Sequence, residues 1–150
     1  MPLSTTNYSF KDISFAFDHP LVSSFIANGQ VGLGQLSIDM TQTRSAIDIS
    51  ADGSAMISYM TGDNGMIMVE CQQTSAIYGF LLNWFNTIKA LADGGDPTNW
   101  ATASVVVVDL IGGHQHQCAA VCPSKVPNRQ YARQGQNQTW ELMAAQIINI

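Results

Sequence analysis

The chain has 150 residues and a net charge of −5, and only 11% of its residues are charged although 46% are hydrophobic. This length accommodates one domain with its own core and is short for two. With six Lys and Arg residues in all, the composition excludes a protein that holds nucleic acid through clustered cations. So little charge also predicts that other copies of the chain cover much of the surface.

The amino-terminal residues lack a basic segment followed by an apolar run, so no signal peptide is expected. The longest apolar stretches, 76–82 and 104–111, fall short of the roughly 20 residues that a membrane span needs. The three cysteines then fit reduced thiols of a protein made in the cytoplasm.

The first part of the chain alternates in the manner of strands. Short apolar alternations from Tyr8 to Ala27, interrupted at Asp18-His19-Pro20, predict two strands and a turn. The following segment, 33–41, alternates more cleanly and predicts one wet and one buried face. The predicted wet face comprises Leu33, Gln35, Ser37, Asp39 and Thr41, and the buried face comprises Leu36, Ile38 and Met40.

A β-hairpin is predicted next, with strands at 44–50 and 55–60. Between them lies Asp52-Gly53, a strong signal for a two-residue hairpin turn. Ile47 and Ile49 alternate with smaller or polar residues, so at most one face of the hairpin is apolar. Segment 66–74 alternates again, and places Glu70 and Gln72 on the face opposite its buried residues.

One helix is predicted, from Ser75 to Asp93, with Thr74 or Ser75 as its cap and Gly94-Gly95 at its end. Apolar residues recur at intervals of three and four and form a stripe that must pack on another element. The expected partner is the outer surface of a sheet or barrel. The predicted packing face comprises Ile77, Leu81, Trp84, Phe85 and Ile88.

Further strands are predicted at 104–110, 114–121, 126–132 and 138–148, and the last of these segments can also be read as a helix. The expected fold class is therefore mainly β with one helix, in a single domain.

A metal site is the most specific chemical alternative. His114, His116, Cys118 and Cys122 could share one face of a strand. Structural zinc sites, however, usually bring two short-spaced pairs together from turns, so we favour two surface histidines beside a half-buried thiol. The glycine-rich segment 28–34 opens a strand and not a helix, which argues against phosphate binding. We predict no catalytic, cofactor-binding or metal-binding residues.

The order of several short motifs resembles the tail tube proteins of contractile-tailed bacteriophages of the Mu-like kind. The motifs are 51–56, Gly62, 65–71, and Thr74-Ser75 opening an apolar helix that contains Asn86. Segments 8–12, 131–135 and 139–141 look like the start and the closing strands of that family. The resemblance therefore spans most of the chain.

This resemblance implies a small β-barrel or folded double sheet with one flanking helix, related in fold to the type VI secretion tube protein. It implies six copies in a ring, with rings stacked into a tube through an extended hairpin at about 41–62. The partners would be the chain itself, the tail sheath protein, and baseplate and tail terminator proteins. DNA would pass through the tube without specific binding, and the protein would reside in the tail of the virion.

These implications give roles to residues that the patterns had singled out. The hairpin that reaches the next ring is expected to use Arg44, Ile47, Asp48, Ile49, Asp52 and Gly53. The lumen wall is expected to include Gln35, Ser37, Asp39, Glu70 and Gln72. A neutral to acidic wall would let DNA slide, because basic residues would bind its phosphates.

Other functions remain open at this point. Another ring-forming tail or baseplate component, or a secretion-type tube, would share these features. A cytoplasmic small-ligand-binding barrel would need an inward cavity, and a small enzyme would need a metal or a reactive thiol.

Overall fold

The computed structural model describes residues 3–28 and 32–150. After a short 3₁₀ turn at Phe10–Asp12, the strands and the helix follow in chain order. They are β1 (Ile13–His19), β2 (Ser23–Asn28), β3 (Leu33–Met40), β4 (Ser45–Ile49), β5 (Ala55–Tyr59), β6 (Gly65–Gln72), α1 (Ala76–Asp93), β7 (Ala103–Asp109), β8 (Gln115–Lys125) and β9 (Asn137–Asn149). The fold is mainly β with one helix, as predicted.

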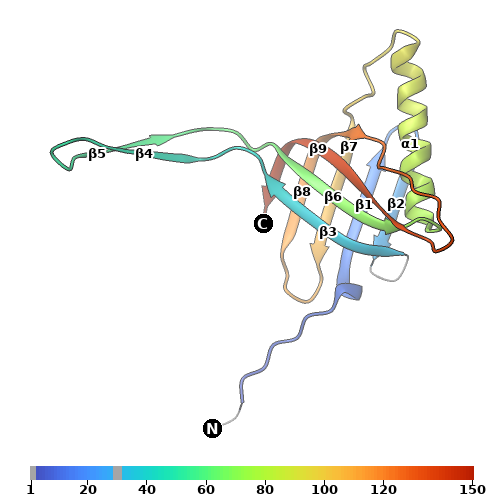
Figure 1. The fold of residues 1–150 in the computed structure, drawn as a ribbon, viewed down its shortest axis with the longest axis horizontal. Coiled ribbons are helices and arrows are strands. Elements are labelled where there is room, and N and C mark those ends of the chain that lie inside the picture. The colour runs from blue at the N-terminus through green and yellow to red at the C-terminus, as the bar shows by residue number, and fades with distance from the viewer. Residues whose placement is uncertain (1–2, 29–31) are drawn as a thin grey trace.

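Seven strands form one antiparallel sheet in the order β2-β1-β7-β8-β9-β6-β3, and β4 and β5 form a separate two-stranded hairpin. The sheet curls into a half-barrel, so that apolar side chains of edge strand β3 and of β1 and β7 line a common space. Figure 1 shows the hairpin projecting away from this body.

The core lies on the concave face of the half-barrel, because each strand turns its alternate apolar side chains inward. In β6, for example, Ile67, Val69 and Cys71 are fully buried, while Met68 between them is exposed. The longest strand, β9, buries Trp140 and Leu142 in the same alternation. The last predicted segment is therefore a strand and not a helix.

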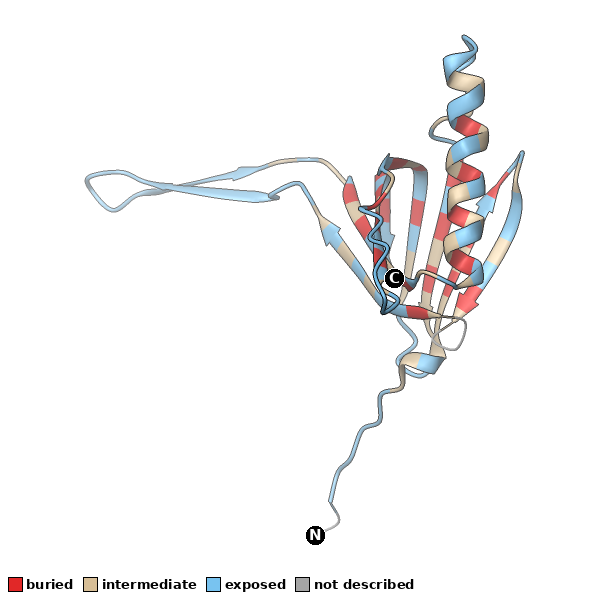
Figure 2. Cartoon of the chain, turned by 45° about the vertical axis from the view of Figure 1, so that its right-hand side comes forward, coloured by how far each residue is buried: buried red, intermediate tan, exposed pale blue. Residues whose placement is uncertain are grey.

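Helix α1 covers part of the concave face. Its buried residues are Ile77, Leu81, Trp84 and Ile88, and Phe85 is half-buried. Four of the five predicted packing residues are thus buried, and Figure 2 shows buried residues as red segments that recur along the helix. The ring of Trp84 meets that of Phe17 edge to face, with centroids 4.8 Å apart.

The sequence predicted a helix on the outer surface of the sheet, but α1 lies inside the curl. An open half-barrel leaves the concave side of its core uncovered, and this is where the apolar stripe of α1 buries the most surface. The helix begins where predicted, since the Ser75 hydroxyl oxygen accepts a hydrogen bond from the Tyr78 N–H at 3.3 Å.

Two predictions about strand residues differ from the structure, and a third cannot be compared with it. Leu33 is buried with the core, because the pairing of β3 with β6 shifts register between Leu33 and Gln35. Segment 126–132 is a loop and not a strand, and its Pro127 lacks the N–H that a ladder needs. Residues 29–31 of the glycine-rich segment lie outside the described residues.

Strand β8 contains a bulge at Ala120, whose φ is +54°. Against β7, Cys118 pairs with Val105 but Val121 pairs with Ala103, so β8 has one extra residue there and both Cys118 and Val121 point into the core. The strand then continues through Pro123, beyond the last β7 pair at Ala103 and Val121. A proline is tolerated there, because no β7 residue is paired opposite it.

Gly65 shows how tightly the first residue of β6 is packed. A Cβ at this position would meet the carbonyl oxygen of Asp39 and would lie 2.6 Å from Cδ1 of Ile147. We expect Gly65→Ala to lower the free energy of unfolding by about 1–3 kcal/mol, because the backbone of β3 must move to admit the methyl group. Urea unfolding followed by circular dichroism measures this change.

The matched control is Gly79→Ala in the exposed part of α1, where a Cβ would meet nothing within 4 Å. This replacement is expected to raise stability by about 0.5–1 kcal/mol, since alanine favours the helix. Equal unfolding midpoints for the two variants would contradict the close packing of Gly65.

Candidate assembly surfaces

The hairpin β4–β5 exposes a large apolar face. Ile47 lies opposite Ile57 and Ser45 opposite Tyr59, so these side chains share one face. Ile47, Ile57 and Tyr59 are 66%, 70% and 74% exposed. All ten residues of the two strands are exposed (Figure 2). We call Ile47, Ile49, Ile57 and Tyr59 the apolar face of the hairpin.

Such a hairpin is unusual as a free element, because an isolated two-stranded ribbon is marginally stable in water. The side chains of Asp48 and Met56 lie on its other face. Single exposed apolar residues are normal, but a contiguous apolar face usually marks a contact with another molecule. The predicted hairpin is thus confirmed, and its one apolar face with it.

The hairpin tip has a three-residue loop and not the two-residue turn that Asp52-Gly53 suggested. The N–H of Gly53 bonds to the Ser50 carbonyl at 3.0 Å, and Gly53 has a φ of +88°. This is the arrangement of a type I turn followed by a left-handed residue, which explains the glycine. The Asp52 carboxylate accepts from the Ser50 hydroxyl and from the Ser54 N–H. These hydrogen bonds lower the pKa of Asp52 to about 2, and the bond from the Ser50 hydroxyl has the largest effect.

The neck of the hairpin connects it to the body. The Arg44 guanidinium pairs with the Asp63 carboxylate, and the Met60 N–H bonds to the Arg44 carbonyl at 2.9 Å. On the body side, the Ile147 N–H bonds to the Asp63 carbonyl at 2.7 Å. Arg44 therefore stabilises the base of the hairpin, whereas Ile47 and Ile49 lie in its exposed strand β4.

The helix-free convex face of the sheet collects the residues predicted for the lumen wall. Register pairs Gln35 with Glu70 and Ser37 with Met68, and Asp39 lies opposite Met66. Gln35, Ser37, Asp39 and Gln72 are exposed and Glu70 is half-buried. The Glu70 carboxylate accepts a hydrogen bond from Asn137 at 3.0 Å. The structure thus brings these five side chains onto one face.

The same face includes residues of β9 that the sequence analysis did not single out. Thr139 lies opposite Glu70 and Glu141 opposite Met68, and Met143 is 47% exposed. The alternation of these residues with buried Trp140 and Leu142 was a usable signal. It was missed because segment 138–148 was also readable as a helix. We call the set the convex wall, made of Gln35, Ser37, Asp39, Met66, Met68, Glu70, Gln72, Thr139, Glu141 and Met143.

The histidine and cysteine cluster does not converge. His116 bonds through Nδ1 to the Asn149 side-chain oxygen at 2.6 Å, and Cys118 is buried below it. The bulge at Ala120, in the pairing of β8 with β7, places Cys122 on the other face of β8. In the described ranges, no three His, Cys, Asp or Glu side chains lie close enough together to hold a metal ion.

Burial of Cys71 and Cys118 lowers the expected reactivity of their thiols. Desolvation raises the pKa of Cys71 and of Cys118 to about 11, and raises that of half-buried Cys122 above its ordinary value. The thiolate is the reacting form, and at pH 8 a thiol with such a pKa is only about 0.1% ionised.

We therefore expect a thiol reagent such as DTNB at pH 8 to modify at most Cys122 in the folded chain and all three cysteines after denaturation. Cys122→Ser serves as the control and should leave no fast-reacting thiol. Rapid labelling of Cys71 or Cys118 in the folded protein would contradict the burial of these side chains.

None of the helices within the described ranges is both long and apolar enough to cross a bilayer.

Comparison with known proteins gives these surfaces a context. The sequence model of the family described as "Bacteriophage PhiTE tail tube protein" matches residues 5–150. The chain belongs to this family. It is accordingly a structural component of a phage-type tail, as the resemblance of its motifs indicated. No curated protein sequence matches the tail tube chain.

Solved structures of contractile injection systems share its fold. A chain of the anti-feeding prophage baseplate, a six-fold symmetrised cryo-EM structure, aligns over 99% of this chain and 97% of its own with a TM-score of 0.65 at 14% identity. A chain of the PVC sheath/tube terminator in the extended state aligns over 99% of both chains with a TM-score of 0.62 at 9% identity. One from the PVC sheath-tube complex covers 96% and 91%, with a TM-score of 0.58 at 10% identity.

Proposed function

We propose that this tail tube protein assembles into six-membered rings that stack into the inner tube of a contractile tail, through which phage DNA passes. The observation that carries the proposal is the exposed apolar face of the hairpin, which has no use in a monomer. Membership of a tail tube family supplies the kind of assembly that would cover it.

The curled sheet supports ring closure. Its edge strands are β2 and β3, and in the described part of the chain neither has a second strand beside it. Unpaired edges invite association with another sheet. In a ring, the edges of neighbouring copies would meet and give a continuous inner barrel without exposed edges.

The convex wall would line the lumen in that arrangement. It carries Asp39, Glu70 and Glu141, and Lys125 lies beside Glu141 in the register of β8 with β9. Such a mixed but acidic wall would repel phosphates weakly and would not bind them. Its exposed methionines, Met68 and Met143, add apolar surface without hydrogen-bond donors that could hold the DNA.

The partners follow from the position in the tail. The tube would be surrounded by a sheath protein and would end at a baseplate and at a terminator. Structures of sheath-tube, terminator and baseplate chains with the same fold support this proposal. The exposed part of α1, on the side away from the sheet, would face the sheath. We propose no catalytic role and no bound cofactor.

Electron microscopy of the purified protein tests the assembly. Negative-stain images are expected to show six-fold rings or hollow filaments of constant width. A stable monomer at high concentration would contradict the proposal. Rings that never stack would favour a terminator or baseplate component, and a monomer with a bound small molecule would favour a ligand-binding barrel.

A further inference from the structure

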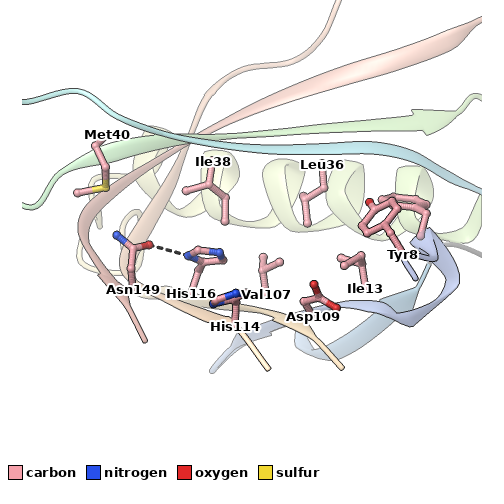
Figure 3. Close-up of a pocket in the computed structure, with 11 residues that line it drawn as sticks. Tyr8, Ile13, Leu36, Ile38, Met40, Val107, Asp109, His114, His116 and Asn149 are labelled. Carbon is pink, nitrogen blue, oxygen red and sulfur yellow. Dashed lines mark hydrogen bonds between the residues drawn. The ribbon is translucent and has the colours of Figure 1, made fainter. Parts of the chain in front are cut away.

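A groove on the concave face is left open by the helix. It has a volume of about 560 Å³ and is lined by apolar side chains from opposite sides of the curl. Leu36, Ile38 and Met40 point into it from β3, and Ile13 and Val107 lie across from them (Figure 3). A space of this size accommodates several side chains.

We infer that this groove receives the apolar face of the hairpin from a second copy of the chain. The inference rests on the proposed tube, since it names the surface against which the hairpin of a neighbouring ring packs. Within the described residues, the hairpin exposes an apolar face to solvent. The groove of the same chain is an open recess lined by apolar side chains. Packing the hairpin of one copy into the groove of another would remove both apolar surfaces from water.

A second copy must supply the hairpin, because the hairpin of the same chain points away from the body (Figure 1). A projection at one place and a recess at another make a head-to-tail contact. Such contacts do not close on two copies; they form rings where the rotation closes and open-ended assemblies where it does not. The stacking of rings into a tube requires the open-ended kind.

The polar groups at the end of the groove fit the hairpin as well. His114 and His116 lie there side by side, and Nδ1 of His116 is bonded to Asn149 (Figure 3). Within the described residues, Nε2 of His116 and the ring of His114 remain available for hydrogen bonds. At its tip the hairpin has the carboxylate of Asp52, which only accepts hydrogen bonds when it is ionised. Asp109 at the same end is already bonded to the N–H groups of Ile111 and Gly112.

Cysteine cross-linking tests the contact. In a Cys122→Ser background, the double variant Ile57→Cys/Leu36→Cys is assembled and then oxidised. We expect a ladder of covalent multimers on a non-reducing gel, because every copy has one partner for each cysteine. Ile47→Cys/Ile38→Cys is a second pair in case the first disturbs the fold. The control Ser58→Cys/Leu36→Cys uses the opposite face of the hairpin and should give at least ten-fold less cross-linking.

A complementary variant, Ile38→Trp, fills the groove and is expected to raise the minimum concentration for stacking at least ten-fold while circular dichroism stays unchanged. Absence of a ladder with both cysteine pairs, or an equal ladder with Ser58→Cys, overturns the inference. Wild-type protein that forms no tubes would contradict the proposed function, whatever the cross-linking shows.

Discussion

The double variant Ile47→Asp/Ile49→Asp is expected to fold normally and to form no tubes. Each buried isoleucine contributes about 1.5–3 kcal/mol, so the two replacements remove about 3–6 kcal/mol from each contact of the hairpin with another copy. This corresponds to a fall in the association constant of roughly 10²- to 10⁴-fold, before the cost of burying two carboxylates is added. Since both side chains are exposed in the single chain, the unfolding midpoint should not change.

Negative-stain microscopy and light scattering across a concentration series measure the effect. The single variants Ile47→Asp and Ala46→Asp form a matched comparison, because they add the same charge to neighbouring positions on opposite faces of β4. Only Ile47→Asp should impair assembly strongly. Tubes of normal length from the double variant would rule out a role of the apolar face in stacking.

The second large effect is expected from reversing charge on the convex wall. Asp39→Lys with Glu70→Lys should leave tubes intact and reduce the infectivity of reconstituted phage at least ten-fold. Lysines repeated around the lumen would bind phosphates, and such non-specific contacts have a Kd of about 10⁻⁴–10⁻⁶ M for a single protein surface. Raising the salt concentration should partly restore DNA release in vitro, because screening weakens these contacts.

The neutral variant Asp39→Asn/Glu70→Gln is the control, since it removes the carboxylates without adding cations. It should retain near-normal infectivity. Glu70 accepts from Asn137, and Gln can still accept through its amide oxygen, so the wall itself should be preserved. Unchanged infectivity of the lysine variant, with tubes of normal width, would mean that the convex wall does not face the DNA.

Local pattern was sufficient for most elements of the fold. Period-two alternation identified β3 and β6 and the exposed side of each, and the spacing in α1 identified its packing stripe. The hairpin followed from alternation on both sides of Asp52-Gly53. These elements were predictable because a strand or helix with one buried face carries its own geometry in the order of its residues.

The sequence predicted less well how elements that are far apart in the chain pack together. The position of α1 inside the curl depends on how seven strands close, which no local spacing encodes. The bulges near Leu33 and at Ala120 each shift the alternation of buried and exposed residues by one position, and a single sequence gives little sign of them. Of the convex wall, β3 and β6 were anticipated, while the β9 residues depended on recognising the last segment as a strand.

The neck of the hairpin also affects how the assembled tail can bend. Two backbone segments connect the hairpin strands to the body of the sheet. The Arg44–Asp63 ion pair and a few backbone hydrogen bonds stabilise this connection. A seven-stranded sheet deforms reluctantly, whereas a joint of this kind can change its angle by rotating a few backbone dihedrals. In the proposed stack of rings, bending of the tail would then occur mainly at these joints, and the inner diameter of the tube would stay constant. The neck of the hairpin would then be the flexible connection between rings that are themselves stiff.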